Sequence, residues 1–265
     1  MSITQRRNQF ALVAIALVGM CSAPAMGSSF KEFFDTAQPP FLPNGWTTDV
    51  IGNSGAFHVV TTDPETPPNC VSCPVPGGVQ DVSLYAPPIP ITGGFSTVNF
   101  KTKFAFDSNA NGALAGGRLE ISIAEVRDGE WLDPTDVNSG LDGEYVTGGP
   151  NMLVASQDNP LAGGGRMVWS GFMNDTYEAV SLKLPAAAVG RTIRLRWRMV
   201  SGSDAASTIG WKVDSLIICD SGDTTSNICP STSCGTGGAC GAMASEGLLL
   251  MGLIGPWRPR WRRRR

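Results

Sequence analysis

The 265-residue chain has few of the residues that most hydrolases and nucleotide-binding proteins depend on. Its only histidine is His58, so a Ser–His–Asp or Cys–His catalytic arrangement would have to use that residue. His58 lies between Phe57 and Val59 in a predicted strand, where an ordinary structural position is expected. No glycine-rich loop leads into a helical pattern, which leaves nucleotide binding unsupported.

Long hydrophobic stretches are also missing. No segment of the body keeps the 3.6-residue apolar spacing of an amphipathic helix. The apolar run 10–20 follows Arg6 and Arg7 and is shorter than the ~20 residues that a membrane span needs. Small residues come next, so residues 1–27 are predicted to be a secretory signal peptide that signal peptidase removes.

The C-terminal residues form a second topogenic segment. Small residues precede a short apolar run at 248–254, and six arginines follow, the last being Arg265. Arginines resist transfer across a membrane, so they should stay on the cytoplasmic side. We predict a sorting segment at 242–265, cut by a C-terminal sorting protease, behind a Cys/Gly/Ser/Thr-rich linker at 221–241. Cys234 or Cys240 would then serve the anchor. A mature protein that retains Arg265 would refute the cleavage.

Charge divides the chain into unlike parts. There are 20 Lys and Arg against 23 Asp and Glu, but eight of the basic residues lie in the two terminal segments. All of the remaining 12 basic residues and 21 of the 23 acidic residues lie in the body, residues 28–220, which gives it a formal net charge of −9. Such a body lacks the electrostatic footprint of a nucleic-acid-binding protein. It suits cations, solvent or a basic partner.

Alternation of apolar and polar residues indicates strands in the body, residues 28–220. In the clearest segment, 192–200, Ile193, Leu195, Trp197 and Met199 alternate with Arg194, Arg196 and Arg198. The pattern predicts an all-β protein, a two-layer antiparallel β-sandwich of the jelly-roll type with long loops. Further strands are expected at 57–61, 98–106, 118–123, 178–184 and 210–218, an edge or irregular strand at 82–91, and loops at 63–79 and 127–166.

Six cysteines remain after removal of the signal, and an even number in an exported chain indicates disulfides. Local bridges are expected within each cluster, one pairing Cys70 with Cys73 and another pairing Cys219 with Cys229. A four-cysteine zinc site is the alternative, but the spacings do not form two CxxC pairs.

The order of several short motifs resembles a known family. They are Leu42-Pro43-Asn44-Gly45-Trp46, 117–122, 159–163, Trp169-Ser170-Gly171, 194–198 and 210–214. Together they resemble the MAM-like jelly-roll accessory domains of bacterial surface proteins, of the cleaved-adhesin or choice-of-anchor type. The resemblance implies adhesion, glycan or protein binding, or support of a neighbouring domain. Ala115 departs from the aspartate that the family usually has there.

Calcium is a candidate cofactor. Asp35, Asp81 and Asp214 each border or lie in a predicted strand, and calcium takes six to eight oxygen ligands. The alternative is that these carboxylates cap turns or pair with arginines. Residues 107–112 imitate the start of an EF-hand loop, but Arg118 stands where a bidentate glutamate is needed, so a hairpin turn is expected.

Three other features bear on ligand chemistry. Glu120 and Glu125 would be the acid and base of a glycosidase, but five residues apart on a strand they point to opposite faces. The Arg194, Arg196, Arg198 row would bind an anionic glycan or a partner's carboxylates, or would form a solvated sheet face paired with acids such as Glu120. Trp131, in the long polar loop, would stack on a sugar or anchor the loop to the sheet.

We therefore expect an exported, membrane-anchored, non-catalytic module at the cell surface. It would bind a glycan or protein as adhesins do, with its site in the loop around Trp131. The alternatives are a secreted jelly-roll glycoside hydrolase and a structural component of the envelope.

Overall fold

The computed structural model describes residues 29–52, 55–163, 165–172, 176–206 and 208–220. The predicted signal peptide, linker and sorting segment, with Cys229, Cys234 and Cys240, lie outside these ranges. The described residues form strands and three short 3-10 turns, η1 (Arg127–Gly129), η2 (Val137–Ser139) and η3 (Ala186–Ala188), and no α-helix. No helix in this part of the chain is long and apolar enough to cross a membrane.

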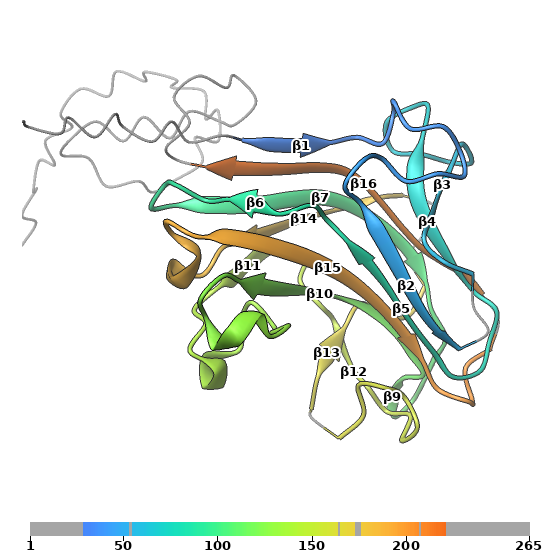
Figure 1. Cartoon of the computed structure of the whole chain (residues 1–265). Coiled ribbons are helices and arrows are strands. Elements are labelled where there is room, and N and C mark those ends of the chain that lie inside the picture. Colours follow the sequence, from blue (N-terminus) through green and yellow to red (C-terminus); the bar gives the residue numbers. More distant parts are fainter. Residues whose placement is uncertain (1–28, 53–54, 164, 173–175, 207, 221–265) are drawn as a thin grey trace, which may run out of the picture. The chain divides into compact units, whose positions relative to one another are not determined.

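Two antiparallel sheets make up the body (Figure 1). The seven-stranded sheet has the order β11-β14-β7-β16-β4-β3. β1 also pairs with β16, beside its last residues, whereas β4 pairs with its first residues. The five-stranded sheet has the order β10-β15-β5-β2, with β6 beside the first residues of β15. The strands of the first sheet are β1 (Phe30–Glu32), β3 (His58–Val60), β4 (Cys70–Val75), β7 (Ser96–Ala105), β11 (Glu144–Thr147), β14 (Glu178–Lys183) and β16 (Thr208–Asp220). Those of the second are β2 (Thr47–Gly52), β5 (Gln80–Tyr85), β6 (Ile89–Pro90), β10 (Ala115–Ile123) and β15 (Thr192–Ser201).

Two small hairpins complete the structure. β8 (Ser108–Asn109) pairs with β9 (Gly112–Ala113), which is the hairpin expected where the sequence imitates a calcium loop. β12 (Met152–Leu153) pairs with β13 (Met167–Val168). Val168 lies so close to Gly116 of β10 that a Cβ at Gly116 would stand 2.5 Å from its Cγ2. Trp169, which follows β13, exchanges two backbone hydrogen bonds with Gly117, so the hairpin lies along the free edge of β10, with Val168 against its outer face.

The core lies between the two sheets, because alternate residues of each strand point inward. Ile193, Leu195, Trp197 and Met199 of β15 are buried, as their alternation predicted. Trp197 contacts Phe100 of the other sheet with ring centroids 5.7 Å apart. The all-β sandwich predicted from the sequence is confirmed.

One expected loop contains a central strand. Residues 63–79 include β4, which pairs with β16 on one side and β3 on the other. Proline is disfavoured inside a sheet because it lacks an N–H, so the presence of Pro74 favoured a loop over a strand in the prediction. A register shift in β16 lies opposite Pro74, and Gly210 there has a φ of 84° and passes directly over the Cys73 carbonyl. The bulge accommodates the proline. β5 is also an interior strand, paired with β15 and β2, where an edge or irregular strand was expected. The prolines that suggested an edge strand come after its last residue, Tyr85.

Candidate functional site

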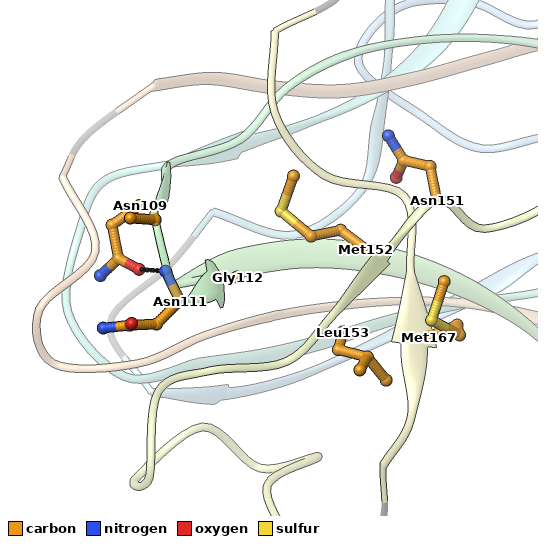
Figure 2. Close-up of a pocket in the computed structure, with 8 residues that line it drawn as sticks. Asn109, Asn111, Gly112, Asn151, Met152, Leu153 and Met167 are labelled. Carbon is orange, nitrogen blue, oxygen red and sulfur yellow. Dashed lines mark hydrogen bonds between the residues drawn. The ribbon is translucent and has the colours of Figure 1, made fainter.

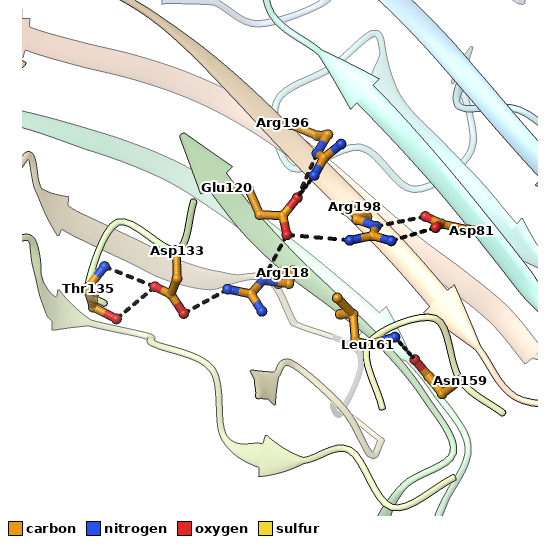
Figure 3. A network of polar contacts seen from close by, with 9 residues as sticks. All are labelled: Asp81, Arg118, Glu120, Asp133, Thr135, Asn159, Leu161, Arg196 and Arg198. Carbon is orange, nitrogen blue, oxygen red and sulfur yellow. Dashed lines mark hydrogen bonds and ion pairs between the residues drawn. The ribbon is translucent and has the colours of Figure 1, made fainter. Parts of the chain in front are cut away.

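The outer face of the five-stranded sheet carries a network of charged side chains (Figure 3). Glu120 of β10 lies opposite Arg196 of β15, whose Nε donates to Glu120 Oε2 at 2.6 Å. Arg118 Nε and Arg198 Nη1 approach Glu120 Oε1 at 3.4 and 3.7 Å. One carboxylate thus faces three guanidinium groups from two adjacent strands.

Two further aspartates balance this charge. Arg198 binds Asp81 of β5 through two parallel hydrogen bonds of 2.8 and 2.6 Å, the geometry that suits a guanidinium and a carboxylate. Arg118 Nη2 donates to Asp133 Oδ2 at 2.7 Å. The hydrogen bond to Asp81 raises the pKa of Arg198, although burial acts in the opposite direction. Three arginines and three acids therefore form a neutral set.

The centre of the network is buried and its other members are half-buried, which corrects the expectation of a solvated face. The side chains of Arg118 and Glu120 are each 2% exposed. A second small apolar cluster covers the same face and includes Leu161 and Val168 with Val200 of β15. The pairing of the arginine row with acids such as Glu120 was foreseen, but the loops that exclude water from it were not.

Arg194 differs from the other arginines of the row. It is exposed, and its cross-strand neighbour on β10 is Ser122. Its guanidinium carbon lies 5.7 Å from the ring centroids of both Tyr85 and Trp131. Within the described ranges of the chain, no acid forms an ion pair with Arg194.

Tyr85 and Trp131 form an aromatic platform at this end of the sheet. Their rings are 5.4 Å apart at an angle of 53°, and both residues are half-buried. Leu132 exchanges two backbone hydrogen bonds with Ile121 of β10 and places its own side chain in the core. The preceding Trp131 then lies over Arg196, whose guanidinium carbon is 4.7 Å from the ring centroid. Because Glu120 holds Arg196, the platform has a fixed base.

The sequence predicted a ligand site in the loop around Trp131, and this residue anchors its loop to the sheet, which was the alternative. Tyr85 was missed. It is the last residue of β5, where Val82 and Leu84 are buried in the core. The alternation of that strand places Tyr85 on the outer face, and this signal would have identified it.

Two surface depressions lie elsewhere. One, of about 420 Å³, lies beside the β8–β9 and β12–β13 hairpins and is lined by asparagines, small residues, Met152, Leu153 and Met167 (Figure 2). None of its lining residues is an acid, a histidine or a cysteine. A second, of about 440 Å³, is lined by residues 154–157, 162 and 163. Neither contains a group suited to acid–base chemistry.

The predicted calcium ligands are not brought together, so they do not form a common site. Asp35 is exposed. Asp81 is bound by Arg198. Asp214 is buried, and its carboxylate accepts backbone hydrogen bonds from Glu65, Thr66 and Ser215. Burial raises the pKa of Asp214, and these hydrogen bonds oppose the rise. The described residues contain no group of three or more His, Cys, Asp or Glu able to hold a metal ion.

The predicted local disulfide between Cys70 and Cys73 is not formed. Both cysteines are free and buried in β4. Three positions apart on a strand, their side chains point to opposite faces, so their sulfurs cannot meet. Cys219 lies in β16, and its predicted partner Cys229 falls outside the described residues, so that bridge stays a prediction.

The candidate catalytic residues are dispersed. Glu120 is enclosed by arginines, while Glu125 lies in the turn after β10 and is exposed. His58 occupies β3, where its Nδ1 contacts the carbonyl oxygen of Ala56 at 2.9 Å. Glu120 and Glu125, the pair considered for a glycosidase, therefore differ in their surroundings, one enclosed and one exposed.

Comparison with known proteins gives resemblances at the level of solved structures. No protein-family model and no curated protein matches the chain. A cleaved adhesin domain of Lys-gingipain from Porphyromonas gingivalis is 16% identical, with a TM-score of 0.41 over 73% of this chain and 99% of that one. A structure described for the promiscuous carbohydrate-binding modules of the β-sandwich superfamily is 15% identical, with a TM-score of 0.41 over 74% and 64%.

A carbohydrate-binding module in complex with β-1,4-galactotriose is 10% identical, with a TM-score of 0.36 over 69% of this chain and 99% of that one. Similarity this low establishes neither a family nor a ligand for the chain. The function is therefore inferred from the chemistry of the sheet face.

Proposed function

We propose that this chain is a non-catalytic binding module whose ligand is a carbohydrate stacked on Tyr85 and Trp131. The observation that carries the proposal is the aromatic platform, two half-buried rings held 5.4 Å apart at one end of a sheet. Aromatic rings with a polar edge combine a large apolar contact with hydrogen bonding. A sugar ring needs both from its binding site.

The platform is held in place before any ligand arrives. Arg196 lies under the Trp131 ring and is bound in turn by Glu120, while Leu132 ties the loop to β10. A preorganised site loses less conformational entropy on binding than a mobile one. Polar side chains border the rings, among them Thr47, which is exposed and lies directly opposite Tyr85 in the sheet.

The same contacts support a binding role over catalysis. A glycosidase requires two carboxyl groups placed on either side of the sugar bond. Glu120, which binds Arg196 below the platform, is buried and faces three arginines, so a sugar cannot reach it. Export and anchoring of the module stay predictions from the terminal segments.

A glycan array followed by titration calorimetry tests the proposal. The purified protein should bind at least one immobilised oligosaccharide. Trp131→Ala should weaken that binding at least ten-fold, because truncating a central aromatic anchor commonly costs a binding site ~2 kcal/mol or more. Phe41→Ala is the matched control, since Phe41 is 72% exposed and lies outside the platform. Equal loss in both variants, or no loss in Trp131→Ala, would contradict the assignment of the site.

A further inference from the structure

We infer that the ligand carries a negative charge beside its stacked sugar ring and that Arg194 binds this charge. The inference rests on the proposed function and adds the class of sugar. It starts from the charge balance of one sheet face. Four arginines, at positions 118, 194, 196 and 198, lie on the outer face of β10 and β15, and three acids neutralise three of them.

Arg194 is the arginine left over. Arg196 has Glu120 directly opposite, whereas Arg194 has Ser122, whose hydroxyl donates to the Gly129 carbonyl. Two acids of the adjoining elements have other partners. Glu130 binds Arg127 at 3.1 Å, and Asp49, two residues beyond Thr47 on β2, accepts a hydrogen bond from Val50. The guanidinium at this end of the face is therefore available to a ligand.

The place of the Arg194 guanidinium beside the aromatic platform suggests a role in ligand binding. The acidic body carries a formal net charge of −9, and general solubility would not require a cation without an acidic partner over two aromatic rings. The guanidinium carbon is equally distant, 5.7 Å, from the centroids of Tyr85 and Trp131. A sugar that stacks on either ring would present its substituents to Arg194.

The chemistry of guanidinium selects the substituent. Its planar N–H donors match the oxygens of a carboxylate or sulfate, and such charge-assisted hydrogen bonds are about twice as strong as neutral ones. A neutral sugar would leave the guanidinium to water. The preferred ligand is thus an acidic sugar, a uronic acid or a sulfated sugar, within a longer glycan.

The experiment compares three oligosaccharides of one backbone by calorimetry: a uronic acid form, its carboxyl-reduced neutral form and a sulfated neutral form. The protein should bind at least one acidic form ten-fold or more tightly than the neutral form. The two acidic forms distinguish carboxylate from sulfate. Because the contact is partly exposed, the preference should shrink as salt is raised.

Variants assign the preference to one residue. Arg194→Gln should bind all three forms with the affinity of the neutral one, and Arg194→Lys should keep part of the preference. Arg127→Gln removes the same charge from the adjacent loop, where Arg127 is half-exposed and paired with Glu130, and should leave the preference intact.

Three outcomes overturn the inference. Equal binding of acidic and neutral forms by the unaltered protein refutes it but leaves the proposed function standing. A preference that survives Arg194→Gln refutes the role of Arg194. Binding of none of the three oligosaccharides refutes the inference, and if the glycan array is also blank the proposed function fails with it.

Discussion

Replacing Glu120 by glutamine should destabilise the protein strongly, although the change is nearly isosteric. Glu120 is the one carboxylate shared by Arg118, Arg196 and Arg198, and its side chain is 2% exposed. In the variant, Asp81 and Asp133 face three arginines, so the buried network gains a net positive charge. Glutamine also presents an amide N–H₂ to guanidinium donors, where no acceptor is available.

The magnitude follows from burial. Removing one partner of a buried ion pair costs ~3–5 kcal/mol, because the remaining charge stays desolvated. In a domain of this size, the melting temperature falls by roughly 2–4 °C for each kcal/mol, so a decrease of about 6–20 °C is expected. Guanidinium denaturation followed by tryptophan fluorescence gives the free energy of unfolding.

Glu130→Gln is the matched control. Glu130 pairs with Arg127 on an adjacent turn, and the two side chains are 54% and 49% exposed. Exposed pairs contribute at most ~1 kcal/mol, so this variant should unfold nearly as the unaltered protein does. If Glu120→Gln lost no more stability than Glu130→Gln, water would reach the network and the reasoning from burial would be wrong.

Two other predictions concern the core. Gly117→Ala would place a Cβ 2.7 Å from the Trp211 ring and should lower the free energy of unfolding by ~1–3 kcal/mol, as measured by denaturation. Gly94→Ala is the control, because a Cβ there has no atom within 4 Å, and it should cost far less. Similar losses in the two variants would show that the Trp211 side chain moves to make room for the added Cβ. Burial raises the pKa of the Cys70 thiol and raises that of Cys73 to about 12, so neither should be alkylated in the folded protein at pH 8, as judged by peptide mass spectrometry. The folded pKa of Cys73 exceeds its ordinary value of 9.0, so the stability that comes from keeping this thiol protonated is complete below pH 9 and is lost as the pH rises toward 12. Rapid labelling of Cys73 at pH 8 would contradict the burial of its thiol.

The alternation of apolar and polar residues predicted the core correctly, because it can be read within a single strand. The inward residues of β7 and β15 could be assigned by counting every second position. β4 escaped this method, since Pro74 argues against a central strand unless a bulge lies across from it. That bulge, at Gly210, is more than a hundred residues away in the chain.

Site residues were harder to infer than core residues. Three aspartates placed in or beside predicted strands gave a calcium hypothesis, but the sequence cannot say which donors meet each carboxylate. Asp214 receives the backbone N–H groups of Glu65 and Thr66, and Asp81 receives Arg198. These contacts depend on strand register and loop position, and both are decided by long-range packing.

Alternation along the chain is enough to predict an all-β sandwich, a core position for Trp197 and an arginine row that alternates with core residues on β15. Tertiary structure decided which of those arginines are neutralised. Pairing of β15 with β10 and β5 brings acids to Arg196 and Arg198 and leaves Ser122 opposite Arg194. The loop that carries Trp131 then covers part of that face. A charge is set by the amino acid, but whether it is buried, paired or open to a ligand depends on neighbours that only folding supplies.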